Sequence, residues 1–179
     1  VIKAGSALDL SALADAPSGK YGRTVINADG LMAFEKNSKA LRLKGPGNFL
    51  DDFWIKGSDE EFNKNAVLLA KAVRAQGYNF FRMHGIDGWI MTETKDDLAF
   101  SPKYLDRWDR LVAEMKKQGI YIEYSCMAYN LFSASDKSYE VAEARNMHKV
   151  MFIAGRDWER ERFRAGVTKL LNHVNPYTG

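Results

Sequence analysis

The residues best placed for chemistry lie in GYNFFRMHGIDGW, residues 77–89, where an aromatic run ends in a cation and an imidazole. Side chains alternate along a strand, so Arg82 and His84 are expected to project from one face near its carboxyl end. A buried guanidinium must be paired, most often with a carboxylate. Arg82 is therefore expected either to hold a catalytic carboxylate or to form a structural pair. His84 would bind a substrate hydroxyl or satisfy the turn at Gly85.

Further candidate ligand contacts lie in or beside the predicted loops. Asp87 in the sequence GIDG is either a turn residue or a contact to a ligand. Trp54 and Trp89 would stack on sugar rings or pack as parts of a loop lid. Tyr129 and Asn130 follow the end of the next predicted strand, within reach of the same ligand.

Other kinds of site find little support. The three histidines and Cys126 show no metal-ligand spacing, and the chain has no GxSxG nucleophile elbow. Neither a metal nor a cofactor is therefore expected. Glu123 is the only acid inside a predicted strand, and it lies too early in that strand for a catalytic acid. We expect it to form a buried structural pair, and assign no catalytic residue.

Composition sets limits on the class of protein. The chain has 179 residues, 46% hydrophobic and 27% charged, which is ordinary for one globular domain. A net charge of +3, with cations interspersed among acids, gives no reason to expect nucleic acid as a partner. No apolar run reaches the length of a membrane span, so no membrane partner is expected. Because the chain begins with Val1, an upstream segment is expected to have been removed.

The elements that must position the candidate residues repeat along the chain. Gln-Gly pairs at 76–77 and 118–119 each end a predicted helix and precede strands predicted at 78–84 and 120–126. A third helix is predicted at about 158–174 from its apolar spacing. Helices between strands require crossover connections, and hence a parallel sheet.

Two parallel architectures compete, a doubly wound sheet and a (β/α)8 barrel. The glycine-rich stretch GPGNFL has the wrong spacing for a phosphate loop, and long loops at 85–100 and 127–157 follow the carboxyl ends of the strands. These features favour an α/β fold made of the first three βα units of a TIM barrel over residues 40–179. Residues 1–39 are expected to form an N-terminal arm and a β-hairpin that turns at Asp29-Gly30.

The order of three motifs, GYNFFRMHGIDG, YLDRWDRLVAEMKKQGIYIEYS and LLNHVNPYTG, resembles clan A glycoside hydrolases. The likeness is to cellulase-like and mannanase-like proteins of the family 5 type and covers roughly residues 20–179. It implies a barrel that cleaves β-linked glycans with retention by means of two glutamates, in a secreted or periplasmic protein. Arg82 matches the family's arginine that supports the nucleophile. The family's third-strand histidine has no match in YSCMAYN.

The resemblance also implies what this chain would lack. Retention needs two carboxyl groups about 5–5.5 Å apart, and the family's glutamates end the fourth and seventh strands. The chain alone is therefore expected to be inactive. Its open strand edges are expected to cause self-association or to be covered by a companion fragment. The alternative is a carbohydrate-binding or scaffold protein on a truncated barrel, with Trp54, Trp89 and Tyr129 as a platform.

Overall fold

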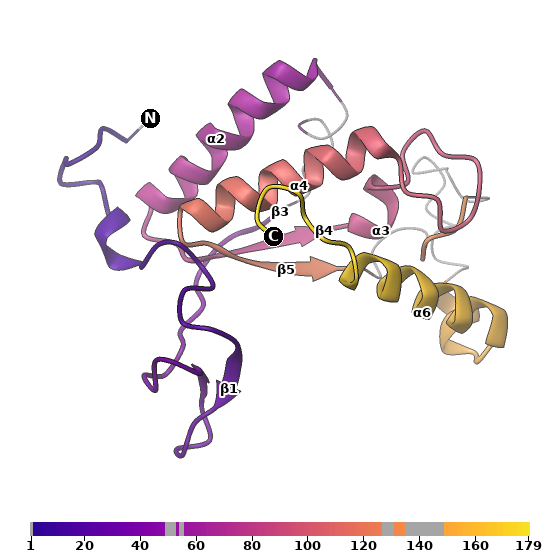
Figure 1. Ribbon diagram of the computed structural model, residues 1–179, viewed down its shortest axis with the longest axis horizontal. Coiled ribbons are helices and arrows are strands. Elements are labelled where there is room, and N and C mark those ends of the chain that lie inside the picture. The colour runs from indigo at the N-terminus through magenta and orange to yellow at the C-terminus, as the bar shows by residue number, and fades with distance from the viewer. Residues whose placement is uncertain (1, 49–52, 54–55, 127–130, 135–148) are drawn as a thin grey trace. The chain divides into compact units, whose positions relative to one another are not determined.

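A computed structural model describes residues 2–48, 53, 56–126, 131–134 and 149–179 (Figure 1). The described part is a mixed α/β protein with a two-stranded sheet, β1-β2, and a three-stranded sheet in the order β3-β4-β5. The chain divides into two compact units. The first unit comprises Val1–Gly47, Glu60–Arg82 and Arg110–Glu123, and the second comprises Asn48–Asp59, Met83–Asp109 and Tyr124–Gly179.

The predicted hairpin is present in the first unit. β1 (Thr24–Ile26) and β2 (Met32–Phe34) pair antiparallel. The side-chain oxygen of Asn27 accepts hydrogen bonds from the backbone N–H groups of Asp29 and Leu31, which closes the turn. The predicted turn residues therefore mark the hairpin correctly.

The predicted helix–glycine–strand repeat is also present. α2 (Asp59–Ala75) and α4 (Pro102–Lys117) each lead, through a short turn, to a strand, β4 (Phe80–His84) and β5 (Tyr121–Ser125) respectively. Gly77 and Gly119 both have positive φ, +75° and +77°. The N–H of each glycine donates to the carbonyl three residues earlier, and the N–H of the residue that follows donates to the carbonyl five residues earlier. This is the Schellman pattern that ends a helix.

β4 and β5 run in the same direction (Figure 1). In the first unit the N–H of Tyr121 donates to the carbonyl of Asn79, and in the second that of Gly85 donates to Ser125. Phe81 and Met83 are buried while Arg82 between them is exposed, so one face of β4 meets the core. In the first unit α2 and the end of α4 lie on one side of these strands (Figure 1).

Between the hairpin and α2, the described residues form one short strand, β3 (Gly47–Asn48). The side chain of Asn79 donates to the carbonyl of Arg42 and accepts from the N–H of Lys44, so a side chain takes the place of part of a backbone ladder. A Cβ atom on Gly45 would lie 1.6 Å from the carbonyl oxygen of Phe80, so this glycine permits a close approach of two backbones.

The N-terminal arm binds the ends of the repeated helices in the first unit. It contains a 3-10 turn, η1 (Ser11–Leu13). The N–H of Leu10 donates to the carbonyl of Ala75, and that of Ser18 donates to Lys116, at 2.8 and 3.0 Å. The arm thus satisfies carbonyls that a helix end leaves without an intrahelical partner.

The second unit contains the short helix α3 (Ile86–Trp89) and α6 (Asp157–Leu171). The third predicted helix is present, but it ends at Leu171 and not at about residue 174. Gly166 faces the core, since a Cβ atom there would lie 2.2 Å from the ring of Phe132. Val174 lies beyond the end of the helix and is exposed. No helix within the described ranges combines the length and hydropathy that a membrane span requires.

Candidate functional site

An ion pair joins two neighbouring strands, β4 and β5. The Nε atom of Arg82 on β4 lies 3.2 Å from the Oε1 atom of Glu123 on β5, and the side chains are 47% and 46% exposed. Arg82 was expected to be buried, and either to hold a catalytic carboxylate or to form a structural pair. The expected burial is wrong, because this face of β4 is open to solvent, and the carboxylate that Arg82 pairs with belongs to the neighbouring strand. Glu123 is paired as expected, but it is not buried.

His84 is the last residue of β4, two positions beyond Arg82. Strand alternation gives the two side chains the same face, as the sequence predicts. The imidazole is half-buried. Its role in binding a substrate hydroxyl remains a prediction.

Asp87 and Trp89 belong to the core of the second unit. Both are fully buried, and a carboxylate oxygen of Asp87 accepts the backbone N–H of Leu131 at 3.0 Å. The predicted substrate contacts are therefore wrong for this conformation. The physical reason is the reversal at Gly85, whose φ of +88° begins α3 and turns the following residues inward.

Asp87 and Arg162 both bond to the backbone of Leu131. The carbonyl of Leu131 accepts a hydrogen bond from Nε of Arg162 at 3.2 Å, and Arg162 also pairs with the fully buried Glu159. Leu131 and Phe132 have φ values of +50° and +62°, which non-glycine residues adopt only under structural constraint. Asp87 and Arg162 are thus structural residues that fix this backbone.

Three predicted contacts, Trp54, Tyr129 and Asn130, lie outside the described residues. Nothing in the structure bears on their expected role as a platform or a ligand contact.

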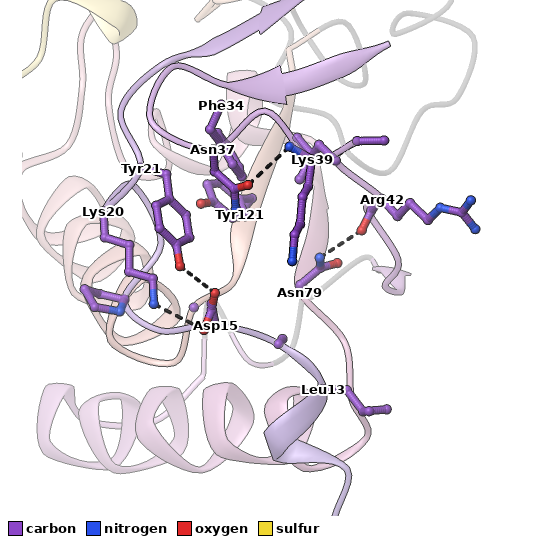
Figure 2. Close-up of a pocket in the computed structure, with 15 residues that line it drawn as sticks. Leu13, Asp15, Lys20, Tyr21, Phe34, Asn37, Lys39, Arg42, Asn79 and Tyr121 are labelled. Atoms are coloured by element: carbon purple, nitrogen blue, oxygen red, sulfur yellow. Dashed lines mark hydrogen bonds and ion pairs between the residues drawn. The ribbon is translucent and has the colours of Figure 1, made fainter. Parts of the chain in front are cut away.

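A pocket of about 310 Å³ lies in the first unit, at the amino-terminal ends of β4 and β5 (Figure 2). Sequence reasoning missed it because its walls come from the arm, the hairpin and two strand starts. No local pattern marks such an assembly. Its lining residues are Leu13, Ala14, Asp15, Pro17, Lys20, Tyr21, Phe34, Asn37, Lys39, Ala40, Leu41, Arg42, Asn79, Gly119 and Tyr121.

One wall of the pocket is aromatic. The rings of Phe34 and Tyr121 stack with centroids 5.1 Å apart and planes 24° apart, and Tyr21 lies on Phe34 at 6.2 Å. The hydroxyl oxygen of Tyr121 accepts the N–H of Gly19 at 3.2 Å, which connects this wall to the arm. Arm, hairpin and strand therefore hold three rings as one surface.

The polar groups of the pocket lie in two places. The Asp15 carboxylate accepts a hydrogen bond from the Tyr21 hydroxyl at 2.8 Å and pairs with Lys20 at 3.2 Å. These contacts lower the pKa of Asp15, the tyrosine hydrogen bond most of all. The side chain of Lys39 extends towards Asn79, whereas that of Arg42 points away (Figure 2).

Comparison with protein-family models, with curated proteins and with solved structures found no match. Among the described residues, no group of three or more His, Cys, Asp or Glu side chains is arranged to hold a metal ion. The functional conclusion therefore depends on the residues and the geometry described above.

Proposed function

We propose that residues 40–179 are the first three βα units of a glycoside hydrolase-like (β/α)8 barrel, and that the open face of β4 and β5 binds β-linked glycans. The observation that carries this proposal is the solvent-accessible pair of Arg82 and Glu123 on that face. A guanidinium and a carboxylate side by side offer donors and acceptors to sugar hydroxyls.

Two features support the barrel. The strands β3, β4 and β5 are neighbours in chain order, without the reversal at which a doubly wound sheet binds its ligand. The helices α2 and α4 lie on one side of the strands in the first unit (Figure 1). The side chains of Arg82 and Glu123 remain about half exposed. In a barrel the other face of the strands would line the interior, and residues near the carboxyl ends of its strands would contact substrate.

The chemistry assigned to this chain is binding without cleavage. A retaining mechanism needs two carboxyl groups about 5–5.5 Å apart, one as nucleophile and one as acid and base. Glu123 supplies one carboxylate, and Arg82 already engages it. In the complete barrel the resemblance assigns the catalytic glutamates to the fourth and seventh strands. We propose that hydrolysis requires those strands.

A second candidate function has one observation in its favour. Arg82 finds its carboxylate within the chain, so its position is explained without a catalytic nucleophile. This favours a carbohydrate-binding or scaffold protein built on a truncated barrel. The two candidates share the glycan-binding face and differ in whether a longer form of the protein hydrolyses the glycan.

The edges of the sheet suggest how the chain associates. β3 and β5 are the outer strands of the three-stranded sheet, and unpaired strand edges invite pairing with another chain. We propose that a second copy or a companion fragment covers these edges. A monomer at high concentration in light scattering contradicts this part of the proposal.

Native gel electrophoresis through soluble β-glucan or β-mannan tests the glycan proposal. At least one of these polymers should retard the wild-type chain. Arg82→Met and Glu123→Gln should be retarded less than the wild type. Lys71→Met and Glu161→Gln, at exposed helix positions, are the charge-matched controls and should stay retarded.

The purified 179-residue chain should release no reducing sugar from either polymer. Release of sugar contradicts the assignment of binding without cleavage. Absence of retardation by all β-linked polymers contradicts glycan binding itself.

A further inference from the structure

We propose that the pocket of the first unit binds a small organic monoanion that carries a planar ring, such as an aryl carboxylate. The pocket lies at the amino-terminal ends of β4 and β5, whereas Arg82 and Glu123 lie further along these strands. It is therefore a site separate from the glycan-binding face, and its test does not depend on the glycan proposal.

The first argument is the charge of the pocket. Lys20, Lys39 and Arg42 are among its lining residues, against one carboxylate, that of Asp15. Lys20 is engaged by Asp15, and Arg42 points away from the pocket (Figure 2). This leaves Lys39 as the cation directed into the pocket, and its ammonium group makes no ion pair or hydrogen bond within the described part of the chain. An ammonium so placed favours an anion, because charge-assisted hydrogen bonds are the strong ones.

The second argument is the aromatic wall. Phe34 and Tyr121 stack, and Tyr21 extends the wall on the other side of Phe34. Aromatic side chains favour offset stacking or edge contacts with another ring, so this wall suits a ligand that carries a planar ring. A volume of about 310 Å³ suits a ligand of one or two rings.

The third argument concerns the number of charges on the ligand. Asp15 places one negative charge in the pocket, where it accepts a hydrogen bond from Tyr21 and pairs with Lys20. A second negative charge placed near Asp15 would be repelled. The pocket therefore fits a monocarboxylate better than a phosphate or a dicarboxylate.

The probe pair for the test is naphthalene carboxylate and its neutral analogue, naphthalene carboxamide. Titrations followed by two-dimensional amide NMR spectra should show naphthalene carboxylate binding with a Kd below about 1 mM, with the largest shifts at Gly119 and Tyr121. The carboxamide should bind about tenfold more weakly or worse, because it keeps the rings and loses the charge.

Two substitutions separate a specific cation from general surface charge. Lys39→Met should weaken naphthalene carboxylate binding about 10- to 100-fold, whereas Lys39→Arg should retain most of it. Arg42→Met removes the same charge from a side chain that points away, and should change Kd by less than about twofold. Because Lys39 is exposed, the amide spectrum of the Lys39→Met variant without ligand should match that of the wild type.

Three results overturn the proposal. They are an absence of shifts at the pocket residues up to several times the expected Kd, equal losses for Lys39→Met and Arg42→Met, and equal affinity for the carboxylate and the carboxamide. Each leaves the electrophoresis result on β-glycans unaffected, so failure at the pocket is distinguishable from failure at the glycan-binding face.

Discussion

The Nε atom of Arg82 lies 3.2 Å from the Oε1 atom of Glu123, across the neighbouring strands β4 and β5. Both side chains are about half exposed, so this pair is available to a ligand and is also screened by solvent. The arginine that the sequence singles out is thus paired inside the chain, on the face where we propose that glycans bind.

The pair should contribute little to stability. Because both groups are about half exposed, Arg82→Met, Glu123→Gln and the double variant should reveal a coupling of about 0–1 kcal/mol in urea unfolding. A coupling above about 2 kcal/mol means that the pair is chiefly structural, which contradicts its assignment to binding.

Gly119→Ala should destabilise the chain by about 2–4 kcal/mol, for two reasons. Its φ is +77°, and an added Cβ atom would lie 1.8 Å from the carbonyl oxygen of Asp15 in the arm. Gly30→Ala is the matched control, because Gly30 has a φ of +75° and a Cβ atom added there would meet no atom within 4 Å. This variant should lose about 1 kcal/mol of unfolding free energy. Thermal and urea unfolding measure both. Equal losses would show that the arm does not press on Gly119.

Cys126 should react slowly in the folded chain. Burial, and secondarily the charge of Asp87, raise the pKa of its thiol to about 12. At pH 8 the thiolate fraction falls about a thousandfold, partly offset by higher intrinsic nucleophilicity, so reaction with an aromatic disulfide reagent should be about 10- to 100-fold slower than for an unstructured thiol. Urea should restore the ordinary rate. A fast reaction in the native chain is inconsistent with this environment.

Asp109 provides a prediction with a defined pH dependence. Burial raises its pKa above the ordinary value of 3.8, and the hydrogen bond from His173, 2.8 Å away, opposes that rise. A carboxyl group with a raised folded pKa contributes stability below pH 3.8, and this contribution is lost as pH rises through the folded pKa. His173→Phe should raise the pKa of Asp109 further, so the stability contribution of Asp109 should be lost at a higher pH. Carboxyl-carbon NMR titration measures this shift, and an unchanged or lower value contradicts it.

Local signals in the sequence predicted the framework of the fold. Gly77 and Gly119 were expected to end helices, and both adopt the left-handed conformation that this requires. The Asp29-Gly30 turn likewise lies between β1 and β2. Each of these features is determined by a few residues that are adjacent in the chain, so it can be predicted from one sequence.

Features that depend on distant residues could not be predicted in the same way. The register of β5 against β4 decides that Glu123 meets Arg82, and no pattern within either strand determines it. Tryptophan is a residue type suited to a stacking platform in a loop, but the reversal at Gly85 buries Trp89. The pocket requires the arm to reach the strand starts, as the bond between Gly19 and Tyr121 shows.

The most direct test of the central claim is to map a β-linked oligosaccharide onto the chain by amide NMR. We predict shifts concentrated in β4 and β5, around Arg82 and Glu123, that are strongly reduced in Glu123→Gln and retained in Glu161→Gln. Shifts that avoid both strands, or that are the same in the two variants, would contradict the assignment of this face as the glycan-binding site.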